Sequence, residues 1–157
     1  CIEAPETGYP YYYYNYNIYN QLNAYTWRLP NLLPGLHTLH YQVTDSLGFT
    51  RETSSQLFIQ IPIQLNTPFN SEGVINIRNP NLLVSGNIGT IQNNNEVEVS
   101  ISLGQIEIYR QVGSNFTANY DLTGLALGDY TLRVVARDTV TNRSSSMSKT
   151  IHFTPTL

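Results

Sequence analysis

The sequence has a single cysteine, Cys1, and few charged residues. One cysteine excludes a disulfide within the 157-residue chain and a metal centre built on several thiolates. Charged residues make up 12% of the chain, about half the usual share, and the formal net charge is −3. Because no basic stripe is present to neutralise phosphates, we expect no binding to nucleic acid.

The chain also lacks long hydrophobic runs and familiar catalytic motifs. No stretch approaches the roughly 18 apolar residues of a membrane-spanning helix. There is no Gly-x-Ser-x-Gly elbow, His-Glu-x-x-His pair, phosphate loop or dinucleotide motif. His37 and His40 are three residues apart on an expected strand, so they project to opposite faces and are poorly placed to share a metal. We therefore predict that the chain is not an enzyme and uses no cofactor.

Cys1 stands at the first position of the sequence, and three interpretations fit it. It carries the lipid anchor of a lipoprotein, it forms a disulfide with another molecule, or it is simply the first residue of a fragment. The residues alone leave the three open.

The most informative feature is an internal similarity between two stretches 93 residues apart. LLPGLHTLHYQVTDSLG begins at Leu32, and LALGDYTLRVVARDTVT begins at Leu125. Five identities fall in fourteen positions without a gap: Leu32 with Leu125, Gly35 with Gly128, Thr38 with Thr131, Leu39 with Leu132 and Asp45 with Asp138. This separation is close to the length of one immunoglobulin-like (Ig-like) domain.

Each copy alternates apolar and polar residues over about eight positions, which is typical of a half-buried strand. The aspartate after each strand, Asp45 or Asp138, is expected to accept hydrogen bonds from backbone amides of the following turn. A calcium site is the less favoured alternative, since neither aspartate lies in a cluster of oxygen ligands. Glu96, Glu98 and Glu107 are expected on solvated strand faces.

The pattern predicts an all-β fold of tandem Ig-like β-sandwiches, the first of them incomplete. Residues 63–157 are predicted to form a complete domain, with strands at 74–77, 81–88, 96–103, 105–112, 115–122, 129–138 and 147–153. Residues 1–62 are predicted to form the C-terminal half of another domain, with strands at 11–19, 24–29, 36–45 and 56–61. A half sandwich leaves strand edges unpaired, so either earlier strands of a longer chain or strands donated by a neighbouring molecule must complete it.

The stretch LLPGLHTLHYQVTDSLG, followed by LFIQI, resembles the closing strands of bacterial Ig-like and hyalin-repeat-like domains of long secreted surface proteins. The second half, with LLVSGNI early and LALGDYTLRVVARD late, is similar to the same family over its whole length. The resemblance implies an extracellular or cell-surface location and no catalytic residues. It also implies a structural role for Asp45 and Asp138.

A cluster of tyrosines near the start is the candidate contact surface. Its members are Tyr9, Tyr11, Tyr12, Tyr13, Tyr14, Tyr16 and Tyr19. In an extended strand Tyr12, Tyr14 and Tyr16 lie on one face and the others largely on the opposite face. Tyrosine buries a large area while keeping a hydroxyl for a partner. Ordinary packing, a contact between subunits of an assembly, and a platform for surface glycans all stay open.

Asn115 and Asn142 match the pattern of N-glycosylation, which this Asn-, Ser- and Thr-rich chain is expected to show by chance. The sequence as a whole predicts a non-enzymatic structural protein of the cell surface or extracellular space, forming an elongated array or filament with an adhesive role. Expected partners are copies of itself or neighbouring Ig-like domains, joined by strand donation, and surface glycans. The alternative is a glycan- or protein-binding module of a larger secreted protein.

Overall fold

The structure is a computed structural model that describes residues 2–3, 11–17 and 29–155, with side chains from residue 29 onward. Strands form nearly all of its regular structure, so the predicted all-β fold is confirmed. The chain divides into two compact units. Unit 1 comprises Cys1–Ile59 with Ile91–Asn94, and unit 2 comprises Gln60–Thr90 with Asn95–Leu157. The predicted domain limits, 1–62 and 63–157, stay a prediction.

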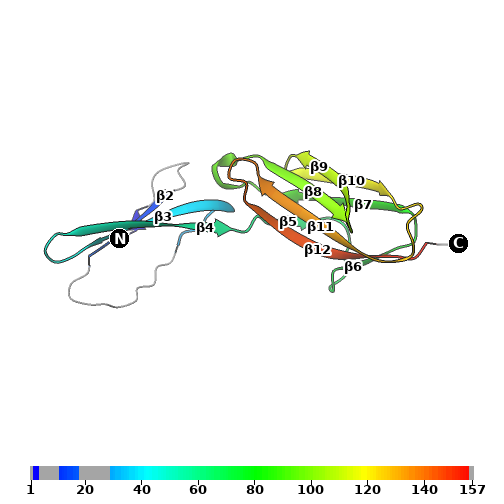
Figure 1. Cartoon of the computed structure of the whole chain (residues 1–157), viewed down its shortest axis with the longest axis horizontal. Coiled ribbons are helices and arrows are strands. Elements are labelled where there is room, and N and C mark those ends of the chain that lie inside the picture. Colours follow the sequence, from blue (N-terminus) through cyan, green and yellow to red (C-terminus); the bar gives the residue numbers. More distant parts are fainter. Residues whose placement is uncertain (1, 4–10, 18–28, 156–157) are drawn as a thin grey trace. The chain divides into compact units, whose positions relative to one another are not determined.

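Unit 2 is an Ig-like sandwich of two sheets (Figure 1). The smaller sheet has the order β10-β7-β5, formed by Asn115–Asp121, Asn81–Ile88 and Ile63–Leu65. The larger sheet has the order β6-β12-β11-β8-β9, formed by Val74–Ile77, Ser144–Phe153, Gly128–Asp138, Val97–Leu103 and Ile106–Val112. All pairs in these sheets are antiparallel except β6 with β12, which run parallel.

The core of unit 2 lies between its sheets and follows from the alternation in the sequence. Along β8 every second residue is buried, and Val99 and Ile101 are fully so. Tyr109 of β9 and Phe116 of β10 meet across the core with ring centroids 6.5 Å apart. A Cβ on Gly86 would clash with the Phe116 ring and the backbone of β5, which explains a glycine inside strand β7.

Unit 1 holds one sheet with the order β1-β2-β3-β4. Its strands are Ile2–Glu3, Tyr11–Asn17, Gly35–Thr44 and Thr50–Ile59. β3 and β4 form an antiparallel hairpin, whereas β2 runs parallel to β3. The short 3₁₀ turn Gln92–Asn94 (η1) also belongs to this unit.

Several predicted strand limits are wrong. β4 begins at Thr50 rather than at 56, and β12 begins at Ser144 rather than at 147. Both early segments are polar and show no apolar alternation, so only their pairing with β3 and β11 makes them strands. The three-residue strand β5 was not expected. The predicted strand at 24–29 lies outside the described residues except for Leu29, which is not in a strand.

Candidate functional site

The turn between β3 and β4 is organised by one aspartate. Asp45 accepts hydrogen bonds through one carboxylate oxygen from the backbone N–H groups of Leu47 and Phe49, both at 2.9 Å. Gly48 adopts a φ of 85°, which glycine allows at little cost. The structural role predicted for Asp45 is confirmed, and the turn backbone is fixed before any partner arrives.

Asp138 plays the same part between β11 and β12 but is fully buried. Its carboxylate accepts hydrogen bonds from the N–H groups of Val140 and Thr141, at 2.8 and 3.2 Å. The Asn95 side-chain amide adds contacts of 3.2 and 3.0 Å to the two oxygens. Burial by itself raises the pKa of Asp138, but the hydrogen bonds from Asn95 and the turn amides outweigh it and hold the pKa below its ordinary value. Protein donors thus engage both oxygens, which fits the predicted structural role.

At the start of each hairpin, an aromatic side chain hydrogen-bonds to the backbone carbonyl of the residue four positions before it. Tyr130 donates its hydroxyl to the carbonyl of Ala126 at 2.7 Å. His37 Nε2 lies 2.7 Å from the carbonyl of Leu33, and because a carbonyl only accepts, Nε2 carries the proton. The two pairs are 93 residues apart. Sequence reasoning missed this correspondence because His37 and Tyr130 are different residue types and do not count as an identity. They do occupy equivalent positions of the repeat, 93 residues apart.

Both aspartate turns display an exposed apolar side chain at the same position. Leu47 is 81% exposed and Val140 is 72% exposed, and each follows its aspartate by two residues. Phe49, in the turn of unit 1, is exposed as well. Binding over such a side chain loses little conformational entropy in the turn, because hydrogen bonds already hold its backbone. The exposed side chains of Leu47, Phe49 and Val140 are therefore candidate contact points.

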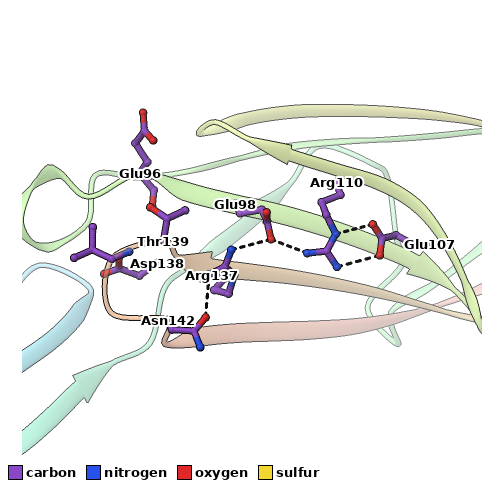
Figure 2. A network of polar contacts seen from close by, with 9 residues as sticks. Glu96, Glu98, Glu107, Arg110, Arg137, Asp138, Thr139 and Asn142 are labelled. Carbon is purple, nitrogen blue, oxygen red and sulfur yellow. Dashed lines mark hydrogen bonds and ion pairs between the residues drawn. The ribbon is translucent and has the colours of Figure 1, made fainter.

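The outer face of the larger sheet carries a row of ion pairs (Figure 2). Glu98 lies between Arg110 and Arg137, with N–O distances of 2.7 and 3.2 Å. Arg110 also binds Glu107 through two hydrogen bonds of 2.7 and 3.0 Å, which lower the pKa of the Glu107 carboxyl. Glu98 lies on the outer face of the sheet, as expected for a residue between the buried Val97 and Val99. Only 17% of its side chain is exposed, because two arginines cover it.

A β-bulge in β9 places Glu107 and Arg110 on one face although they are three residues apart. The register runs from Glu98↔Val112 to Ile101↔Tyr109 and then shifts to Ser102↔Glu107, which leaves Ile108 as the extra residue. Such a bulge re-aims the side chains that follow it. β9 is the last strand of its sheet, and a bulge and charged side chains both discourage pairing with a further strand.

A shallow depression of about 690 Å³ lies beside these ion pairs. Hydrogen-bonding side chains of Ser102, Gln105, Glu107, Asp129, Thr131 and Arg133 line it. Asp129 contacts His152, so the two carboxylates of the depression already have basic partners. Within residues 29–155, Arg133 makes no ion pair with a described side chain. The depression therefore offers both hydrogen-bond donors and hydrogen-bond acceptors.

The tyrosine-rich stretch contributes strand β2. It pairs in parallel with β3, from Tyr11↔Thr38 to Asn17↔Thr44. In unit 2 the corresponding side of β11 is occupied by β8, which runs antiparallel. β2 thus takes the position that β8 has in unit 2, in the opposite direction. Tyr9 and Tyr19 lie outside the described residues, so the contact surface stays a prediction.

The other predicted sites are scattered. Asn115 is exposed at the first residue of β10. Asn142 is exposed on the β11–β12 turn with a φ of 63°, and its side-chain oxygen accepts a hydrogen bond from Arg137 at 2.9 Å. Glycosylation of either stays a prediction. Cys1 lies outside the described residues.

Metal-ligating side chains do not gather in the part of the chain that the structure describes. Its His, Cys, Asp and Glu residues form no group of three that could hold an ion. His37 is fully buried, whereas His40 lies on the other face of β3 and is half-buried. No helix among the described residues has the length and apolarity that crossing a membrane requires.

The comparisons with known proteins identify no family for the chain. No family model matches the sequence, and no curated protein does. A solved structure of Clostridium thermocellum CbhA fibronectin(III)-like modules is similar, with a TM-score of 0.47 and 12% sequence identity. The alignment covers 78% of this chain and 64% of that one, so the chain spans less than two thirds of its length.

Proposed function

We propose that the chain is a non-enzymatic structural module, working in an elongated array or filament of Ig-like units at the cell surface or in the extracellular space. One observation carries the proposal: both units build a hairpin on the same plan. The aspartate turn and the ring that caps a carbonyl recur 93 residues apart, with matching hydrogen bonds. Residues that specify the same hairpin twice favour a unit that is repeated for length.

The surface supports a role in contacts rather than in chemistry. The side chains at Leu47 and Val140 are apolar, exposed and fixed on rigid turns, which suits contact with neighbouring units or an adhesive partner. Glu98, Glu107 and Asp129 are engaged by arginines or a histidine, and Asp45 is engaged by backbone amides. Adhesion and partner choice are part of the proposal.

Electron microscopy of the native material tests the array. Antibodies raised against unit 2 should label the cell surface or secreted fibres at regular intervals along elongated structures. Labelling restricted to single compact particles, or to the cell interior, contradicts the proposal. A strain that lacks the protein supplies the control for antibody specificity.

A second function, glycan binding, is favoured by the depression beside Arg133. Shallow polar sites with paired donors and acceptors suit neutral sugars, whose hydroxyls both donate and accept. Titration calorimetry with neutral oligosaccharides tests it on the whole chain. Saturable binding that is lost in Arg133→Ala, but kept in Ser146→Ala on the neighbouring β12, supports this function. No heat with any oligosaccharide contradicts it.

A further inference from the structure

Within unit 1, the turn Ile91–Asn94 lies against the start of β3. The N–H group of Gln92 donates a hydrogen bond to the carbonyl of Pro34 at 2.7 Å. A Cβ on Gly35, the first residue of β3, would lie only 3.0 Å from the Cβ of Gln92. Gly35 and Ile91 are both buried. A main-chain hydrogen bond and a close approach over a glycine therefore hold the turn in place.

The Ile91–Asn94 turn has a defined backbone of its own. Asn93 and Asn94 adopt φ angles of 60° and 53°, which asparagine tolerates better than most residues. The N–H of Asn94 donates to the carbonyl of Ile91 at 3.1 Å and closes the turn. In the sequence the turn connects β7 to β8. Another Ig-like unit that has these two strands would carry a turn at the same place.

Unit 2 repeats the backbone on which this turn rests. Gly128 begins β11 as Gly35 begins β3, 93 residues earlier. Their φ angles are 144° and 124°, both in the region that favours glycine. Each glycine also pairs with the last residue of the second strand of its hairpin. The carbonyls of the preceding residues, Leu127 and Pro34, therefore hold equivalent positions in the two hairpins.

The position in unit 2 is exposed. Leu127 is 74% exposed, whereas its counterpart Pro34 is half-buried. A Cβ on Gly128 would meet no atom within 4 Å. Among the described residues, no hydrogen bond reaches the carbonyl of Leu127. The acceptor and the glycine that hold a turn in unit 1 are thus present in unit 2 and accessible there.

We propose that Leu127 and Gly128 bind a turn of a further Ig-like unit, in which an apolar residue precedes one that donates its backbone N–H, the chemistry of Ile91 and Gln92. The N–H donates to the carbonyl of Leu127, and the apolar residue covers the exposed Leu127 side chain. Gly128 lets the turn approach as closely as it does over Gly35. This inference rests on the proposed array and specifies a contact that joins unit 2 to the next unit.

A peptide of residues 89–95, Gly-Thr-Ile-Gln-Asn-Asn-Asn, closed head to tail, tests this contact on the whole chain. We expect saturable NMR shifts of the Leu127 methyl groups and the Gly128 amide. The methyl groups of Val140, another exposed apolar residue of unit 2, should not respond.

The matched control peptide carries N-methylglutamine, which removes only the donating N–H. It should bind roughly tenfold more weakly, because the Leu127 carbonyl then gains no donor. Equal binding by both peptides, or binding by neither, overturns the proposal.

Two glycine variants test the close approach. Gly128→Ala places a methyl group where the turn must lie, so the affinity for the peptide should fall at least roughly tenfold. Gly124→Ala is the control, since Gly124 has a φ of 93° and a Cβ there also meets no atom within 4 Å. It should bind as the unchanged protein does. Unchanged affinity in Gly128→Ala overturns the proposal, and if that variant does not fold, the peptide pair still decides.

The array and the turn contact fail in different ways. Arrays seen by microscopy together with no peptide binding overturn the turn contact and leave the array. Peptide binding by a protein that occurs only as single particles supports the turn contact and overturns the array.

Discussion

Replacing Asp138 with asparagine tests the account of the buried aspartate turn. The carboxylate accepts from two backbone amides and the Asn95 amide. A hydrogen bond to a charged group contributes about 1.5–3 kcal/mol, against about 1 kcal/mol for a neutral one, and an unsatisfied buried donor costs about 1–3 kcal/mol. Asparagine at position 138 is uncharged, which weakens these bonds. It also replaces one acceptor oxygen with an NH2 group, which would face the NH2 donor of Asn95. We expect a loss of about 3 kcal/mol in the free energy of unfolding of unit 2.

Hydrogen exchange at core amides of β11, such as Val134, measures this loss because those amides open only when unit 2 unfolds. Asp45→Asn is the matched control. It alters an exposed turn in unit 1 and should leave exchange in unit 2 unchanged. A loss below about 1 kcal/mol in Asp138→Asn would refute the reasoning, since the hydrogen bonds would then contribute no more than neutral ones.

The pH dependence supplies an independent check on Asp138. Its pKa is lowered on folding from the ordinary 3.8, so the unfolded chain binds more protons there. The stability it contributes is therefore present above pH 3.8 and is lost as the pH falls through the lower folded value. The stability gap between the unchanged protein and Asp138→Asn should be constant near neutral pH and shrink below pH 3.8. Glu107 and Asp121, whose pKa values are also lowered, are present in both proteins and cancel.

Three further substitutions test the packing and hydrogen bonds of unit 2. Gly86→Ala places a methyl against the backbone of β5 and should cost at least roughly 3 kcal/mol, measured by urea unfolding. Tyr130→Phe removes the bond to the Ala126 carbonyl and should cost about 1 kcal/mol in the same assay; an unchanged midpoint would show that water replaces it. Ser145→Ala leaves the buried N–H of Ile61 without its 2.8 Å acceptor, so exchange of that amide should quicken and stability should fall by about 1–3 kcal/mol.

The sequence predicted the strands whose apolar alternation faces a core. β6 and β7 begin and end where the pattern places them, because turn residues flank a period of two. The polar early parts of β4 and β12 were missed, since the hydrogen bonds of a partner strand, rather than side-chain burial, make them strands. β5 has three residues and is too short to show any period.

Among the candidate sites, those built from residues close together in the sequence were predicted, and those that depend on strand pairing were not. The turn aspartates were predicted, because their hydrogen bonds reach only two to four residues along the chain. The ion pairs of Glu98 were not, because they depend on which residues of β8, β9 and β11 lie opposite one another. The bulge at Ile108 changes that register by one position, and no local sequence signal marks it.

The parallel pairing of β6 with β12 gives unit 2 a direction in which it resists force. These strands lie near the beginning and the end of the unit and are joined by their backbones from Val74 to Phe153. Once β5 has separated from β7, tension applied through the two ends pulls β6 and β12 in opposite directions along their length. Their hydrogen bonds then bear the load together in shear instead of opening one after another, as in a peeled hairpin. Unit 2 under stretch would then resist unfolding through this one short ladder.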